Sequence, residues 1–143
     1  MISRRVVVAT KDLVRSRVAG TFEQVLGFWR ALTVLPSVEH GRRSGAPAAL
    51  IGKIRLRGAR SRQRSLADRE TLRRVIAIVD RLLLDGGNCY RRALLEMALD
   101  AGAAREPLRF GLRAHGGPRS GHAWLASWPD AAKAGTYDAV LEM

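Results

Sequence analysis

The first third of the chain carries hydrophobic and polar residues with the period of an amphipathic helix. From about Lys11 to Leu35, apolar residues recur every three or four positions. Pro36 should end this helix, because proline has no amide hydrogen and its ring crowds the preceding turn. Residues 40–47, rich in Gly, Arg and Ser, are predicted to form a loop, and residues 48–54 either resume a helix or form a short edge strand.

Two further helices are predicted on either side of a glycine-marked break. Leu66 to Leu84 shows the clearest helical periodicity, and Ser65 is a suitable N-cap with Asp68 three residues later. The break at residues 85–88, Asp-Gly-Gly-Asn, separates it from a helix over Cys89 to Leu99. This last helix therefore begins at the single cysteine of the chain.

The C-terminal third changes to the period-two alternation of half-buried strands. Residues 108–114 alternate apolar and polar side chains, and residues 120–128 are predicted to be their antiparallel neighbour across a glycine-rich turn at 115–119. Pro129-Asp130 is a turn signal, and residues 136–141 supply a third strand. Helices followed by strands indicate an α+β fold, in which a helical N-terminal part packs on a small antiparallel sheet.

Length and composition indicate one soluble domain. A chain of 143 residues suffices for a single hydrophobic core, so we expect one domain over 1–143, with a basic helical part at 1–64 and the candidate catalytic core at 65–143. No apolar run is long enough to predict a membrane span, and the brief run Val6 to Ala9 is too short for a signal peptide. We therefore expect a cytoplasmic protein.

The positive charge of the chain is concentrated before the cysteine. Residues 1–88 hold 18 basic and 7 acidic side chains, a net +11, whereas residues 89–143 hold 7 and 6, a net +1. Most of the basic residues are arginine, which favours paired contacts with carboxylates or phosphates. The arginine-rich stretch from Arg55 to Arg69 is predicted to be an exposed connector or a solvated face, and Arg55, Arg57 and Arg60 are candidates for docking an acidic partner. Nucleic acid is the rival partner.

Cys89 occupies a position that activates a nucleophile. One cysteine excludes an intramolecular disulfide and a cysteine-based zinc site. At the start of a helix, unsatisfied amide groups and the helix dipole stabilise a thiolate, and the same amides can bind the oxyanion of a tetrahedral intermediate. Gly86 and Gly87 leave room for a peptide to approach. A small, buried and inert Cys89 is the plainer interpretation.

A histidine and two aspartates follow the cysteine. His122 begins a predicted strand, from which an imidazole can serve a cysteine as general base, and a third group then orients the ring. If the chain reverses at Pro129-Asp130, Asp138 falls nearly opposite His122, and if it reverses at residues 126–127, Asp130 does. A lone strand histidine is usually a core or surface residue, so the joint pattern carries the hypothesis.

At these residues the sequence resembles the leader peptidases of lasso peptide biosynthesis, the B proteins, which belong to the transglutaminase-like, papain-related superfamily. The run from Cys89, Cys-Tyr-Arg-Arg-Ala-Leu, is similar to the Cys-x-x-Arg-Ala start of the family's catalytic helix. Residues 108–112, Leu-Arg-Phe-Gly-Leu, and the run from His122, His-Ala-Trp-Leu, resemble its strands. The resemblance extends from Leu66 to the C-terminus, and the chain's length resembles the split type, which works with a separate leader-recognition protein.

The resemblance implies a cysteine endopeptidase with a papain-like core. It implies Cys89 as nucleophile, His122 as general base, an aspartate as orienting group, and neither a metal nor an organic cofactor. The candidates Asp130 and Asp138 lie 8 and 16 positions after the histidine, and the family's acidic residue falls between these spacings, so both are retained. The implied partners are a precursor peptide, the leader-recognition protein and an ATP-dependent macrocyclase.

Two other functions fit parts of the pattern. A basic nucleic-acid-binding module accounts for the charge but leaves Cys89 and His122 unexplained, and the chain shows no nucleic-acid recognition motif. A non-catalytic scaffold with a degenerate triad accounts for the fold alone. Arg92 is expected either to brace the fold through a buried ion pair, which is the favoured role, or to contact the substrate, and Trp124 is expected to be a core aromatic residue.

Overall fold

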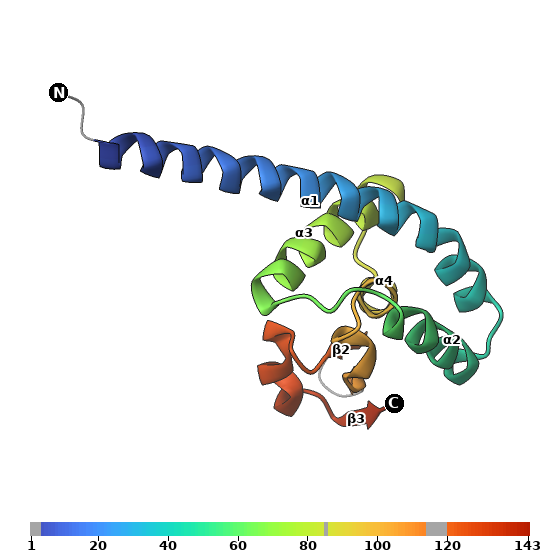
Figure 1. The fold of residues 1–143 in the computed structure, drawn as a ribbon. Helices are drawn as coiled ribbons and strands as arrows, with labels where there is room; N and C mark the ends of the chain where they lie inside the picture. The colour runs from blue at the N-terminus through green and yellow to red at the C-terminus, as the bar shows by residue number, and fades with distance from the viewer. Residues whose placement is uncertain (1–3, 85, 114–119) are drawn as a thin grey trace.

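The computed structural model describes residues 4–84, 86–113 and 120–143. These residues form four α-helices, two 3₁₀-helices and a three-stranded antiparallel sheet, which confirms the α+β class (Figure 1). The turn predicted at 115–119 lies outside the described residues. The elements are α1 (Arg4–Arg43), α2 (Pro47–Ala59), α3 (Leu66–Leu83), α4 (Cys89–Leu99), η1 (Ala103–Arg105), β1 (Leu108–Arg113), β2 (Ser120–Leu125), η2 (Pro129–Thr136) and β3 (Ala139–Glu142).

Helix α1 continues through Pro36, so the prediction that it ends there is wrong. The first part of α1 extends beyond the body and its last turns curve over it (Figure 1). An interior proline costs a helix about 3 kcal/mol. Val34 and Val38, on either side of Pro36, are fully buried, and this burial offsets the lost hydrogen bond. The helix therefore also covers the first half of the region predicted to be a loop.

Residues 47–59 form helix α2, which decides the open choice between helix and strand. Pro47 lies in its first turn, where the missing amide hydrogen is no loss. Because α2 continues to Ala59, the exposed connector is shorter than predicted and ends at Ser65. Arg69 at the end of the predicted connector is a buried residue of α3. This part of the prediction is wrong because Arg64 and Arg69 serve internal ion pairs, whereas Arg57 and Arg60 are exposed.

The two helices around the glycine break begin where they were predicted. The Ser65 hydroxyl accepts a hydrogen bond from the Asp68 amide at 3.1 Å, which caps α3. The Gly86 amide donates to the Asp80 carbonyl at 2.9 Å as the chain leaves α3, and Gly86 has a φ of 69° that glycine adopts without strain. Helix α4 then starts at Cys89.

Strand β1 is the central strand of the sheet, whose order is β2-β1-β3. Strand β2 pairs with β1 as predicted, and its register places His122 opposite Gly111. Strand β3 pairs with the other edge of β1, with Val140 opposite Gly111. Residues 129–136 form η2 rather than a tight turn, so the chain passes from one edge of the sheet to the other.

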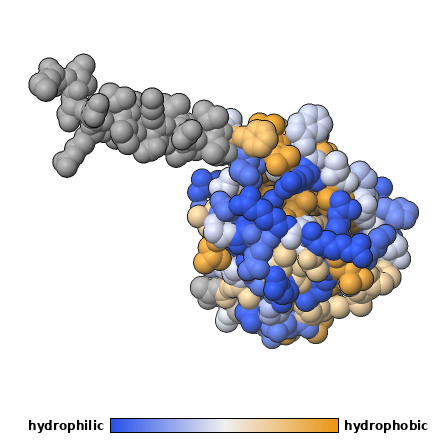
Figure 2. Space-filling view, in the orientation of Figure 1, coloured by the Kyte–Doolittle hydropathy of each residue, from blue (hydrophilic) through white to orange (hydrophobic). Residues whose placement is uncertain are grey.

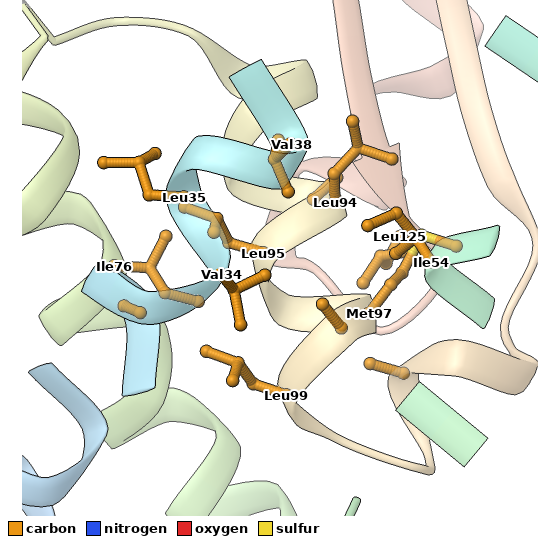
Figure 3. Packing of buried hydrophobic residues seen from close by; sticks show 14 of the residues in the cluster. Val34, Leu35, Val38, Ile54, Ile76, Leu94, Leu95, Met97, Leu99 and Leu125 are labelled. Carbon is orange, nitrogen blue, oxygen red and sulfur yellow. The ribbon is translucent and has the colours of Figure 1, made fainter. Parts of the chain in front are cut away.

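One hydrophobic core joins the helices to the sheet. Figure 3 shows Val34 and Val38 of α1 close to Leu94 and Leu95 of α4, with Ile76 of α3 beside them. Ile54 of α2 and Leu125 of β2 complete the same cluster. Residues before and after position 64 thus share one core, and the two predicted parts differ in charge rather than in packing.

The surface of the body is mainly hydrophilic in the view of Figure 2, and hydrophobic side chains gather where α1 leaves the body. Helix α1 exposes Phe22, Val25 and Trp29 in its middle turns. Among the described residues, no helix combines the length and the apolar character that a membrane crossing requires.

Candidate active site

The first turn of α4 presents Cys89 with backbone donors around it. Asn88 is the N-cap, and its side-chain oxygen accepts a hydrogen bond from the Arg91 amide at 2.9 Å. The Arg92 amide donates to the Asn88 carbonyl at 3.1 Å. The Cys89 and Tyr90 amides have no acceptor among the described residues, as expected for the first amides of a helix. They are available to an anionic group of a substrate.

Ion pairs hold the first turn of α4 against α1 and α3. The Arg91 guanidinium donates to Glu39 of α1 and to Asp80 of α3, each at 2.5 Å. The Arg92 Nε donates to the other oxygen of Asp80 at 2.7 Å, which confirms the predicted ion pair of Arg92 with a buried partner. Three helices therefore meet at the two residues that follow Tyr90, and they fix where Cys89 lies.

Hydrogen bonds and opposite charges within this cluster shift the pKa values of Glu39 and Arg91. Burial acts to raise the pKa of Glu39, but the hydrogen bonds and charges of Arg91 and Arg42 outweigh it, and the net effect lowers that pKa. Burial also acts to lower the pKa of Arg91, yet Glu39 and Asp80 raise it overall. The Glu39 carboxylate and the Arg91 guanidinium thus remain ionised at neutral pH.

Tyr90 anchors the same turn to the sheet. Its ring lies 5.3 Å from that of Phe110 in β1, measured between centroids. Its hydroxyl is buried with no hydrogen-bond partner among the described residues, and burial raises the pKa of Tyr90. The aromatic contact joins the start of α4 to the central strand.

The sulfur of Cys89 contacts β2. The Ala123 amide donates a hydrogen bond to Cys89 Sγ over 3.2 Å. Since neighbouring amides of a strand point to opposite sides and the Ala123 amide is directed at α4, this contact lies at the edge of β2 that β1 leaves free. A backbone donor and the α4 N-terminus both stabilise negative charge on the sulfur.

His122 directly precedes the residue that contacts the sulfur. It shares one face of the sheet with Gly111, opposite it in β1, and with Trp124, two positions along β2. Ala123 and Leu125 point to the other face, into the core. The structure thus places Cys89 Sγ against the residue that follows His122, and His122 is half-buried on the outer face.

The hairpins that were predicted to bring Asp138 or Asp130 opposite His122 do not form. Because β3 pairs with β1 and not with β2, Asp138 lies across the central strand from His122, and its amide donates to the Leu112 carbonyl at 3.0 Å. The residue before it, Tyr137, stacks on His122. Asp130 lies in η2, and its side chain is outside the described part.

A pocket of about 270 Å³ lies further along α4, between α3 and the start of η2. Arg92 and Glu96 line it, and they occupy the same helix face as Cys89 because they follow it by three and seven residues. Ile76, Ala77 and Trp128 supply apolar lining, and Arg73 and Arg74 supply positive charge.

A buried network below the pocket joins α3, α4 and the end of β2. Glu96 is inaccessible to solvent and accepts hydrogen bonds from Arg69, Arg73 and the Trp128 indole, the last at 2.7 Å. Arg69 also pairs with Glu106, which accepts the Ser127 amide at 2.9 Å. This network positions the residues that follow β2.

Glu106 makes the stability of the protein depend on acid pH. Burial acts to raise its pKa, but hydrogen bonds from Arg69 and Ser127 lower it below the ordinary value of 4.5. A carboxyl with a lowered folded-state pKa contributes stability that is complete above the unfolded pKa and is lost as the pH falls through the folded one. We expect the free energy of unfolding to fall below pH 4.5, and to fall less steeply in Glu106→Gln.

Urea unfolding between neutral pH and pH 3 measures this slope. Glu70→Gln is the matched control, because Glu70 forms an exposed ion pair with Arg74 on α3. Equal slopes in Glu106→Gln and the wild type would contradict the assignment.

Among the described residues, no group of three or more histidine, cysteine or acidic side chains is arranged to hold a metal ion. Comparisons of the chain with protein-family models, with curated proteins and with solved structures found no match.

Sequence patterns do not reveal the residues that support the site from other elements. Glu39, Asp80 and Arg91 were not singled out, because helix periodicity does not reveal which polar residue of a helix will be buried. Tyr137 and Gly111 were also missed. A glycine inside a strand is a known sign of a close approach, so Gly111 was a signal that the sequence offered.

Proposed function

We propose that this protein is a cytoplasmic cysteine endopeptidase with a transglutaminase-like, papain-related core, which removes the leader from a ribosomally made precursor during lasso peptide maturation. The observation that carries the proposal is the hydrogen bond from the Ala123 amide to Cys89 Sγ. It joins a thiol at a helix N-terminus to the strand residue that follows His122, and thiol catalysis requires a base close to the thiol.

The proposed reaction is acyl transfer followed by hydrolysis. The Cys89 thiolate attacks the scissile carbonyl carbon, and the amides of Cys89 and Tyr90 bind the resulting oxyanion. Protonated His122 gives its proton to the leaving amine, which becomes the N-terminus of the core peptide. Water then attacks the thioester with His122 as base, releasing the leader as a carboxylate and restoring the thiol. A separate ATP-dependent macrocyclase closes the ring.

Asp138 is the preferred orienting residue of the two candidates. It follows Tyr137, whose ring stacks on that of His122. Its amide is bonded to β1, the strand that pairs with the strand of His122. Asp130, in η2, is the alternative. Separate Asp138→Asn and Asp130→Asn variants in the cleavage assay distinguish them, because only the orienting residue lowers kcat strongly when its charge is removed.

If the neighbouring genes encode a precursor peptide and a leader-recognition protein, the peptidase reaction is tested with these two proteins. Mass spectrometry of the products should show one cut that separates leader from core. A second, substrate-free measurement is the reaction of Cys89 with iodoacetamide, which should be faster than that of a free thiol. A rate equal to that of free cysteine would favour a non-catalytic scaffold.

The exposed arginines of α2 and the following connector are proposed to dock an acidic leader or the leader-recognition protein. Arg57 and Arg60 are exposed, whereas Arg55 is half-buried and donates to the Glu106 and Met143 carbonyls, the latter at 2.8 Å. Arg55 thus holds the C-terminal strand and is not suited to a charge-reversal test. The docking surface is redefined as Arg57 and Arg60.

Reversing both charges, in Arg57→Glu/Arg60→Glu, should weaken binding of the precursor and recognition protein by roughly tenfold, mainly through the association rate and at low salt. Arg81→Glu, on the exposed side of α3, is the matched control. Calorimetric titration at low and high salt measures the effect. Unchanged affinity of the double variant would remove this surface from the proposal.

The nucleic-acid alternative would depend on the arginines that face solvent. Arg64, Arg69 and Arg91 have side chains that are nearly inaccessible to solvent and are paired with Asp100, Glu96 and Asp80 respectively. The guanidinium groups in these internal ion pairs are not available to bind phosphates. Steeply salt-dependent binding to duplex DNA or RNA would revive this alternative.

A further inference from the structure

Tyr137 lies with its ring nearly parallel to that of His122, the candidate base. Its ring is 6.2 Å from the His122 ring and 5.2 Å from the Trp124 ring between centroids, with interplanar angles of 12° and 23°. His122 and Trp124 are themselves 5.6 Å apart and 17° from parallel. Three rings from two separate segments therefore form one offset-parallel cluster, an arrangement that aromatic rings favour.

Gly111 of the central strand β1 leaves the space that the Tyr137 ring occupies. A Cβ placed on Gly111 would lie 2.5 Å from Cγ of Tyr137 and within 2.8 Å of both Cδ atoms, so any other residue at this position would displace the ring. The Arg113 guanidinium lies 5.6 Å from the ring centroid as a cation–π contact. The position of Tyr137 is thus determined by β1, not only by its own segment.

We infer that Tyr137 is a positioning residue, which holds the imidazole of His122 in the plane that serves Cys89. The inference rests on the proposed function, since it concerns how the proposed base is oriented. A histidine at a free strand edge can rotate about two side-chain bonds, and each rotation away from the sulfur removes the base. A ring packed parallel to the imidazole restricts both rotations, which keeps the reacting groups oriented.

The ring of Tyr137, and not its hydroxyl, is the part that acts. Tyr137→Phe preserves the stacked ring and should leave the reaction unchanged, whereas Tyr137→Leu removes it. Gly111→Ala displaces the same ring without altering Tyr137. Gly121→Ala is the matched control, because its Cβ would meet only Leu112 Cδ2 at 3.6 Å and the Gly111 carbonyl at 4.0 Å, which are ordinary contacts.

Iodoacetamide alkylation of Cys89 in the full chain is the first readout, because Cys89 is the single thiol and no substrate is needed. We expect the second-order rate to fall roughly tenfold in His122→Ala, which sets the scale of the base's contribution. Tyr137→Leu and Gly111→Ala should give a large part of that loss, whereas Tyr137→Phe and Gly121→Ala should react like the wild type.

The NMR signals of the His122 ring protons are the second readout, which a merely structural role of Tyr137 would not move in this pattern. Stacked rings shift these protons upfield in the wild type, in Tyr137→Phe and in Gly121→Ala. The shift should be reduced in Tyr137→Leu and Gly111→Ala, in samples whose circular dichroism shows an intact fold.

The outcomes separate the inference from the proposed function. If His122→Ala lowers the alkylation rate but Tyr137→Leu leaves both rate and ring shift unchanged, the positioning role is overturned and the peptidase proposal stands. If His122→Ala reacts like the wild type, the Cys89–His122 pair fails as catalytic machinery, and the ring shifts alone decide whether Tyr137 holds the imidazole. Loss of rate in Tyr137→Phe would also overturn the inference, because the hydroxyl would then be the acting group.

Discussion

Cys89→Ala is expected to abolish leader removal, lowering the cleavage rate by at least roughly a thousandfold, because no other thiol is present to form the acyl-enzyme. His122→Ala should produce a loss of similar size, since nucleophile and base act as one unit. The double variant should be no slower than either single variant. The measurement is precursor cleavage by mass spectrometry under single-turnover conditions.

Cys89→Ala should abolish the cleavage reaction and leave the fold intact. Cys89 packs at the margin of the core, and the first turn of α4 is fixed by Arg91 and Arg92 rather than by the thiol. Cys89→Ser, which keeps the size of the side chain but not its acidity, should be folded and similarly inactive. Cleavage by Cys89→Ala at a rate near that of the wild type would end the proposed mechanism.

Glu96→Ala is expected to destabilise the protein by roughly 3–5 kcal/mol, the largest stability effect that the structure predicts. Glu96 is fully buried and neutralises Arg69 and Arg73, of which Arg69 is also buried. Its removal takes from Arg73 its carboxylate partner, leaves the buried Arg69 with only Glu106 and Asp100 as carboxylate partners among the described residues, and frees the Trp128 indole from its acceptor. In a chain of this size the melting temperature should fall by roughly 10 °C.

Thermal and urea unfolding measure this effect, with Glu70→Ala as the matched control. Glu70 lies on α3 and pairs with Arg74, but both side chains are largely exposed, so its loss should change stability little. A similar, small change in both variants would show that the buried network contributes no more than a surface pair.

Local signals in the sequence were sufficient for the start of α3 and α4. Ser65 and Asn88 each accept a hydrogen bond from the amide three residues later, and such caps depend only on neighbouring residues. The pairing of β1 with β2 was also predicted, because a short connection and matching alternation favour an antiparallel pair. The candidate pair Cys89 and His122 came from these local elements.

The remaining features depend on contacts between distant segments. The burial of α1 residues beside Pro36 keeps that helix intact, and the sequence shows only the local cost of the proline. The choice of β1 rather than β2 as the partner of β3 follows from η2, which carries the chain to the other sheet edge. Because β3 does not pair with β2, Asp138 does not lie opposite His122, where a hairpin would have placed it.

The sequence by itself determined the α+β order, the helix that begins at Cys89 and the strand that carries His122, because capping and periodicity are short-range properties of the chain. The tertiary structure alone decided that Ala123 contacts the sulfur, that Asp80 and Glu39 hold the first turn of α4, and that Gly111 admits Tyr137 beside His122. These contacts join residues of separate elements. They arise only when the shared core fixes the relative positions of helices and sheet.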